Sequence, residues 1–495
     1  MNYVSTRDSK LRMTAAQAIV KGLAPDGGLM TPSVMPRMPA SALNSLKDMT
    51  YQQRVLYIIS RFLTEFSTLE LTNYIMAAYG KGKFSDPAVA PVRQLDEKTH
   101  CLELWHGPTC AFKDMALQML PHLLSASLDK ILEKNTACIL TATSGDTGKA
   151  ALEGFKDVRK TRILVFYPKD GVSDIQELQM VTQEGGNVDV CAIKGNFDDA
   201  QTGVKKLFSD PELAAELESR GYLLSSANSI NWGRVLPQIA YYVSAYCDML
   251  KSGSIEPGQA INVCVPTGNF GNILAAYYAS LMGVPIKKLI CASNSNNVLT
   301  DFIETGVYDR NRAFHNTLSP SMDILVSSNL ERLLFELSEH DDAQVQAYMA
   351  SLNETGRYEV NSSLRAKIQR LFAAGYCDDD QTRDMIARMW TERHYLIDPH
   401  TAVAFHVLEQ YRAKTGDDTV TLVASTASPF KFCSAVLGAL GVRELKNGTD
   451  ILDQLAEFTS VEVPAPLAAL KDKPRRFSAV TEKDHMIDQV LEILK

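Results

Sequence analysis

Apolar side chains in the first part of the chain recur mainly at helical spacing. In residues 51–66 and again in residues 69–78, apolar positions return every three or four residues, the pattern of a helix with one buried face. Residues 22–29 contain Pro25 and several glycines and are typical of a loop. We therefore predict a mostly helical N-terminal domain over residues 1–92.

Beyond residue 92 the pattern changes to short apolar runs that alternate with helical stretches. This alternation predicts an α/β architecture with mainly parallel sheets. We expect a smaller α/β domain over residues 93–218 and a larger one over residues 219–495, with mostly helical structure between about 300 and 415. The predicted strands are residues 136–141, 162–167, 188–193, 222–226, 261–265, 288–292 and 419–424.

Net charge, apolar stretches and the spacing of cysteines and histidines argue against several classes of protein. The 495 residues carry a formal net charge of -8, which argues against broad electrostatic binding to nucleic acid or to anionic membranes. The longest apolar stretch, residues 273–286, is too short to span a bilayer, and the N-terminus lacks the apolar region of a secretory signal. The nine cysteines form no CxxC pair, and the histidines show no HExxH motif. We expect a cytoplasmic protein without a metal site, either a monomer or a homodimer.

Three unusual loops follow predicted strands, and ligands bind beyond the carboxyl ends of strands in open α/β sheets. The first, residues 143–148, offers the hydroxyls of Ser144 and Thr147 and the N–H groups of a helix start. A P-loop is excluded because Thr143 replaces its first glycine and Ala150 its magnesium-binding hydroxyl. The loop is either a plain turn or an anion site.

The second loop, residues 266–272, joins a strand to a helix through two glycines. Such a helix N-terminus carries partial positive charge and favours a phosphate. The third loop, residues 424–429, follows the last predicted strand. It is either a turn with a Ser or Thr helix cap or a source of a hydroxyl that contacts a ligand.

Lys113 lies where the turn at Gly107 and Pro108 passes into an amphipathic helix. The N-terminus of a helix disfavours a cationic ammonium, and burial there would lower the pKa of the amine. A neutral amine can react with carbonyl groups. Lys113 is therefore a better candidate for carbonyl chemistry than most of the chain's lysines.

The order of four features resembles the fold type II family of pyridoxal-phosphate (PLP) enzymes, related to tryptophan synthase β. These features are Lys113, the loop at 143–148, the loop at 266–272 and Thr426. Further segments resemble threonine synthases of the long type, which have an extra N-terminal domain. They are Ser5-Thr6-Arg7, residues 22–29, His106 to Asp114, residues 195–201, residues 228–234 and Asp398 to Val403.

The resemblance implies an enzyme that converts O-phospho-L-homoserine and water to L-threonine and phosphate. Lys113 would carry pyridoxal 5'-phosphate as a Schiff base and transfer protons, and Thr426 would contact the ring nitrogen. The cofactor phosphate would bind to Gly268, Asn269, Phe270, Gly271 and Asn272. The substrate carboxylate or the ring oxygen of the cofactor would face Ser144, Asp146 and Thr147. Candidates for the substrate's phosphate are Lys149, Asn231 and Arg234.

Two positions depart from the family pattern: Ser428 stands where many members carry His, and Phe430 stands where they carry Ala. Two alternatives share the same motifs. A related phospholyase would release 2-oxobutyrate, ammonia and phosphate from the same substrate. A non-catalytic phosphate-binding α/β protein would leave Lys113 as an ordinary surface lysine.

Overall fold

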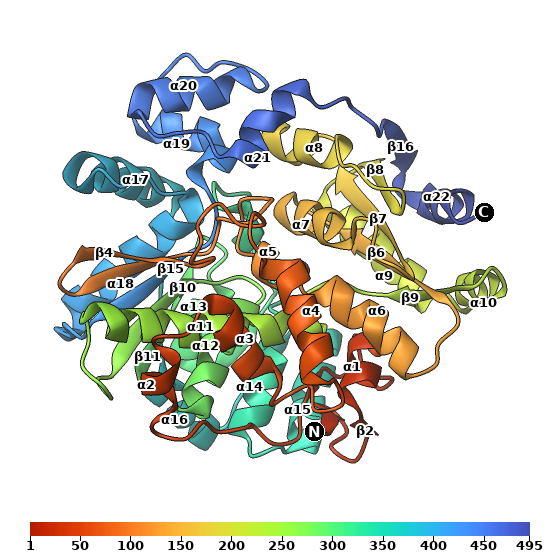
Figure 1. Ribbon diagram of the computed structural model, residues 1–495, viewed down its shortest axis with the longest axis horizontal. Helices are drawn as coiled ribbons and strands as arrows, with labels where there is room; N and C mark the ends of the chain where they lie inside the picture. The colour runs from red at the N-terminus through yellow and green to blue at the C-terminus, as the bar shows by residue number, and fades with distance from the viewer.

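The computed structural model describes residues 1–495, the side chain of Asp198 excepted, and its core contains two separate sheets (Figure 1). The larger sheet is parallel except for its edge strand β4, which pairs antiparallel with β5. The strand order is β14 (Phe372–Tyr376), β11 (Ile286–Ser293), β10 (Ile261–Pro266), β15 (Thr421–Ser425), β5 (Thr99–Glu103) and β4 (Val92–Asp96).

The smaller sheet is parallel throughout. Its order is β16 (Ala479–Glu482), β8 (Val188–Lys194), β7 (Thr161–Pro168), β6 (Thr136–Ala142) and β9 (Tyr222–Ser225). Side chains of β6 alternate between two cores: Ile139 belongs to the main core shared with α7 (Asp146–Phe155), and Leu140 to the core under α9 (Phe197–Ser209) and α22 (Met486–Ile493). Helices therefore cover both faces, as an all-parallel sheet requires.

All seven predicted strands are present, so the α/β prediction is confirmed. The region between 300 and 415 is mostly helical, as expected, but also contributes β14 and the short pair β12 (Val307–Asp309) and β13 (Arg357–Glu359). Its helices are α13 (Val298–Thr305), α14 (Leu330–Leu337), α15 (Asp342–Thr355), α16 (Ser362–Leu371), α17 (Asp379–Arg393) and α18 (Pro399–Thr415).

The N-terminal region contains the predicted helices and a small sheet that was not predicted. The helices are α1 (Ala15–Lys21), α2 (Ala42–Leu46), α3 (Tyr51–Ile59) and α4 (Thr68–Tyr79). The antiparallel strands β1 (Tyr3–Ser5), β2 (Arg12–Met13) and β3 (Met30–Pro32) are too short to show an alternating pattern. Trp232, fully buried at the start of α11 (Trp232–Ser252), packs against Tyr3 and Phe62 and joins this region to the larger domain.

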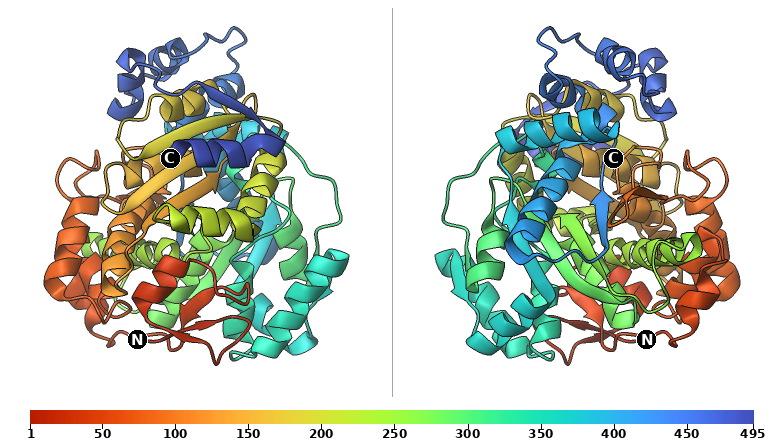
Figure 2. Two further views of the ribbon diagram at one scale, coloured as in Figure 1. Left: turned by 90° about the vertical axis from the view of Figure 1, so that its right-hand side faces the viewer. Right: turned by 90° about the vertical axis from the view of Figure 1, so that its left-hand side faces the viewer.

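The sheets do not follow the predicted domain limits at two places. Strands β4 and β5 lie within residues 93–218 but belong to the larger sheet, and β16 lies near the C-terminus but pairs with β8 of the smaller sheet. Figure 2 shows this dark blue C-terminal segment against the yellow strands. A linear boundary cannot describe a chain that crosses between the sheets in this way. Among the described residues, no helix has both the length and the apolar character of a membrane span.

Candidate active site

Most of the predicted site residues line a cavity of about 670 Å³. The wall is formed by loops at the carboxyl ends of strands from both sheets, by α9, by Lys21 at the end of α1 and by Leu23 just beyond it. The predicted residues that line it are Lys113, Ser144, Asp146, Thr147, Arg234, Gly268, Asn269, Phe270, Gly271, Asn272 and Thr426.

Lys113 immediately precedes α5 (Asp114–Leu117) and is fixed by backbone contacts with the loop after β15. Phe112 N–H donates to the carbonyl of Thr426 at 2.8 Å, and Ala111 forms an isolated antiparallel bridge with Ala427. These contacts hold Lys113 and Thr426 at the same cavity, although 312 positions separate them in the chain.

The amine of Lys113 is buried, with only 9% of its side chain exposed. Nζ donates to Ser321 Oγ at 3.2 Å and lies 3.7 Å from Asp146 Oδ2. Burial lowers the pKa of Lys113 most strongly, the Asp146 carboxylate opposes this effect, and the nearby Lys431 and Arg234 cations add to the lowering. The net pKa is below its usual value, so a neutral amine is more accessible than at the surface.

The loop at residues 143–148 forms the N-terminus of α7. Gly145 adopts φ 126°, and Thr143 Oγ1 accepts hydrogen bonds from the N–H groups of Gly145 (3.0 Å) and Gly148 (2.8 Å). A Cβ on Gly145 would lie 2.4 Å from the Gln176 side chain, so the turn needs glycine for both its angle and its space. Ser144 and Thr147 remain on the cavity wall.

The loop after β10 leads into α12 (Gly271–Met282) through Phe270, which adopts the left-handed φ of 62°. The carbonyl of Gly268 accepts from Ser327 Oγ at 2.7 Å, and that of Asn269 accepts from Asn329 N–H and Nδ2 at 3.1 and 3.0 Å. The first N–H groups of any helix lack intrahelical partners. Because the loop carbonyls are hydrogen-bonded to Ser327 and Asn329, the N–H groups at the start of α12 can bind an anion.

Arg234 is a buried cation on the cavity wall. Its Nη1 donates to the carbonyl of Ala227 at 2.5 Å, whereas its Nε has no hydrogen-bond partner among the described residues. Burial lowers the pKa of the guanidinium to about 10, so it is charged at neutral pH. No carboxylate of the described residues lies within ion-pair distance of it, which leaves its charge available to an anion in the cavity.

Two predicted residues are not brought to the cavity. Lys149 points to the far side of α7, where Nζ contacts Glu153 Oε2 at 3.3 Å and Gln183 Oε1. Asn231 is the N-cap of α11: Oδ1 accepts from Gly233 N–H at 2.9 Å and Nδ2 donates to the carbonyl of Ile19 at 2.9 Å. Their polar atoms have partners within the protein, and their contact with the substrate phosphate stays a prediction.

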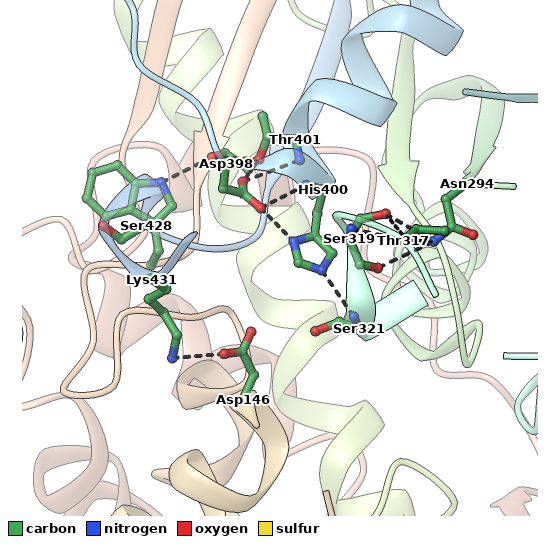
Figure 3. A network of polar contacts seen from close by, with 12 residues as sticks. Asp146, Asn294, Thr317, Ser319, Ser321, Asp398, His400, Thr401, Ser428 and Lys431 are labelled. Atoms are coloured by element: carbon green, nitrogen blue, oxygen red, sulfur yellow. Dashed lines mark hydrogen bonds and ion pairs between the residues drawn. The ribbon is translucent and has the colours of Figure 1, made fainter. Parts of the chain in front are cut away.

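A series of hydrogen bonds that was not predicted from the sequence leads to Ser321, the partner of the Lys113 amine; the series is shown in Figure 3. Asp398 accepts from His400 Nδ1 at 2.7 Å, and His400 Nε2 accepts from Ser321 N–H at 3.2 Å. These contacts place the imidazole proton on Nδ1. The Asp-Pro pair before α18 signals a capped helix start, and Asp398 is indeed the N-cap. Nothing local indicates that His400 faces Ser321.

Lys431 was also missed, and it lies within a short 3-10 turn, η2 (Pro429–Phe432). Ser428 caps this turn through a hydrogen bond from Phe430 N–H at 3.3 Å. The Ser428 side chain thus has a local structural role at the position where the family pattern differs. The Lys431 amine is fully buried, donates to the carbonyl of Thr109 at 2.8 Å and contacts Asp146 Oδ1 at 2.9 Å. Across the described residues, no group of three or more His, Cys, Asp or Glu side chains could hold a metal ion.

Family comparisons cover the chain almost from end to end. Residues 2–79 match the family described as threonine synthase N terminus, residues 90–426 match pyridoxal-phosphate dependent enzyme, and residues 401–491 match threonine synthase, C-terminal. The chain is 39% identical to human threonine synthase-like 1 over 461 residues. That match covers 90% of this chain and 61% of the relative, so the chain spans less than two thirds of the relative's length.

Threonine synthase of Schizosaccharomyces pombe is 36% identical over 469 residues, which cover 89% of each chain. Among solved structures, PLP-bound threonine synthase from Brucella melitensis superimposes with a TM-score of 0.88 at 36% identity, covering 100% of both chains. Yeast threonine synthase gives a TM-score of 0.88 at 32% identity and covers 99% of this chain and 98% of that one.

Proposed function

This chain belongs to the threonine synthase family of pyridoxal-phosphate-dependent enzymes, and we propose that it converts O-phospho-L-homoserine and water to L-threonine and phosphate. One observation carries the proposal. A single cavity combines a buried amine, Lys113, with two separate anion sites: the N-terminus of α12 and the unpaired guanidinium of Arg234. Such a wall suits a phosphorylated cofactor beside a phosphorylated substrate.

The residues at the N-terminus of α12 fit the cofactor phosphate. Asn272 Oδ1 accepts hydrogen bonds from the hydroxyls of Tyr241 (2.7 Å) and Tyr242 (2.5 Å), which fixes the amide so that Nδ2 is the free end. This buried Nδ2 has no partner among the described residues. An unsatisfied buried donor is costly, and a phosphate oxygen would satisfy it. Gly268, Asn269, Phe270 and Gly271 would supply the surrounding backbone.

Lys113 would hold the cofactor and then act as the base. Pyridoxal phosphate, when bound, supplies an electron sink for negative charge at the substrate α-carbon. Lys113 Nζ, whose pKa is lowered by burial, would take the α-proton and return protons later in the cycle. Thr426, at the end of β15, would offer its hydroxyl to the ring nitrogen without changing that nitrogen's charge.

The substrate would lie between Lys113 and Arg234. Ser144 and Thr147, with the N–H groups at the start of α7, suit the substrate carboxylate. Arg234 suits its phosphate, because a guanidinium can donate two parallel hydrogen bonds to a phosphate. In the overall reaction a β-proton is removed, the C–O bond at the γ-carbon breaks and phosphate leaves with the bonding electrons. A proton is then added at the γ-carbon, and water supplies the hydroxyl group at the β-carbon.

The test is product analysis with the purified, PLP-loaded protein. Incubation with O-phospho-L-homoserine should yield L-threonine and phosphate in equal amounts, identified by chromatography against standards. Release of 2-oxobutyrate and ammonia with phosphate would show a phospholyase instead. Absence of any turnover, together with absence of visible absorbance from bound cofactor, would refute catalysis.

We also propose a cytoplasmic location and a monomeric or homodimeric state. The location is supported by nine cysteines that are all buried and free of disulfides. The net charge of -8 supports a small-molecule enzyme that does not bind nucleic acid. Size-exclusion chromatography with light scattering would determine the oligomeric state.

A further inference from the structure

Asp146 is a carboxylate in a loop otherwise built for anions. It lies at the first position of α7 and only 3% of the residue is exposed. A substrate carboxylate would be repelled by a second carboxylate at hydrogen-bond distance. The charge of Asp146 must therefore serve a different partner.

The contacts of Asp146 identify that partner. Oδ1 accepts from Lys431 Nζ at 2.9 Å and from Gln176 Nε2 at 3.0 Å, so this oxygen is committed to the protein. Oδ2 lies 3.7 Å from Lys113 Nζ. In Figure 3 the Lys431 amine reaches the Asp146 carboxylate directly. The carboxylate is thus held from one side and presented to Lys113 on the other.

We propose that Asp146 is a positioning residue for Lys113. Lys431 and Gln176 fix its carboxylate, and Oδ2 orients the Lys113 amine and supports its ammonium form after the amine has taken a proton. This inference deepens the proposed function and rests on it. It replaces the prediction that Asp146 contacts the substrate.

The charged groups around Lys113 support this role of Asp146. The charged groups that face Lys113 are Asp146 on α7, Lys431 on η2 and Arg234 on α11. Asp146 is the carboxylate among them. Burial alone would raise the pKa of Asp146, but Lys431 and Lys113, with a smaller effect of His400, hold it well below the usual range. Asp146 is therefore ionised throughout the working pH range.

The sharpest test is Asp146→Asn, which keeps the shape of the side chain and removes its charge. Another ion pair of α7 provides a matched control, because Glu153 pairs with buried Lys149 at 3.3 Å outside the cavity wall. Glu153→Gln removes the same kind of charge from the same helix without altering the surroundings of Lys113.

The first readout does not depend on catalysis. In the cofactor-free full chain, reductive methylation modifies only neutral amines, and peptide mass spectrometry isolates Lys113. The pH of half-maximal methylation should fall by about one unit or more in Asp146→Asn, as expected for loss of an opposite charge at this distance. Glu153→Gln should leave it unchanged. An unshifted midpoint in Asp146→Asn would overturn the proposal.

The second readout uses the PLP-loaded enzyme and O-phospho-L-homoserine. Asp146→Asn should lower kcat at least about tenfold while KM stays within about threefold, because the effect acts on proton transfer and not on substrate binding. A raised KM with preserved kcat would make Asp146 a substrate ligand and overturn the proposal.

A second variant addresses folding. Asp146→Asn leaves Lys431 buried without its counter-charge, which destabilises a protein more than removing both charges together. The double variant Asp146→Asn/Lys431→Gln should regain thermal stability but not kcat. Recovery of kcat would contradict the role of the carboxylate. If the wild-type enzyme formed no threonine, the proposed function would fail, while the methylation result would still decide whether Asp146 controls Lys113.

Discussion

Gly268 offers a direct test of how the loop proposed to bind the cofactor phosphate, residues 266–272, is shaped. A Cβ on Gly268 would lie 2.9 Å from the carbonyl oxygen of Ser321 and 3.2 Å from the Cα of Met322. Both are backbone atoms, so no side chain can rotate away. Ser321 is in turn held by its N–H bond to His400 Nε2. In Gly268→Ala the loop must therefore move toward the open cavity.

The magnitude follows from the cost of an extra methyl in a packed site, about 1–3 kcal/mol. The free loop relieves this strain by moving, but phosphate binding requires it to return. We expect the affinity for PLP to fall by roughly 5- to 150-fold, since about 1.4 kcal/mol corresponds to a factor of ten. Gly271→Ala is the matched control in the same loop, because its Cβ would meet nothing closer than 3.5 Å.

The assay is titration of the cofactor-free protein with PLP and, in parallel, with pyridoxal, which lacks the phosphate. Gly268→Ala should weaken PLP binding strongly and pyridoxal binding little, and Gly271→Ala should resemble the wild type with both. An equal loss for the two ligands, or no loss for PLP, would refute the reasoning that this close backbone approach shapes a phosphate site.

Three further predictions concern Lys113, Thr426 and Asp114. Lys113→Ala should abolish threonine formation and remove the visible absorbance of the purified protein; an undiminished band would exclude Lys113 as the attachment site. Thr426→Ala should lower kcat while PLP stays bound, and full activity would contradict contact with the ring nitrogen. Burial raises the pKa of Asp114 to about 6, so ionising this side chain destabilises the folded protein. The destabilisation is absent below about pH 4 and fully developed above about pH 6. Asp114→Asn should remove this pH dependence, measured by urea unfolding of the variant and the wild type at pH 5 and pH 8.

The strands and the loops that follow them could be predicted because their determinants are local. Seven apolar runs long enough to show a pattern became strands. The segments that were missed are short, such as β2 at Arg12–Met13, or depend on a distant partner, such as β16, which pairs with β8 almost 300 positions earlier. A window of local sequence contains no information about such a partner.

The candidate site shows the same limit. Gly268, Asn272 and Thr426 lie within a few residues of the ends of strands, and the structure places all three on one cavity wall. Lys149 and Asn231 were predicted as donors for the substrate phosphate, but the chemical type of a side chain does not determine the direction in which it points. Asn231 in fact carried a local signal that was not used, since Asn before a helix is a favoured N-cap.

The charge of the cavity could not be predicted from the net charge of the chain. The chain is acidic overall, with a net charge of -8, yet four cationic side chains and two carboxylates line the cavity. The carboxylate of Asp146 is matched by Lys431, which lies off the wall, and that of Asp323 accepts hydrogen bonds from Asn294 and Thr317. Asp323 is therefore satisfied from behind, and Asp146 is shared between Lys431 and Lys113. The other three cations have no carboxylate within ion-pair distance among the described residues and retain their charge toward the cavity. This local excess of positive charge, absent from any sum over the sequence, is what a phosphorylated substrate beside a phosphorylated cofactor requires.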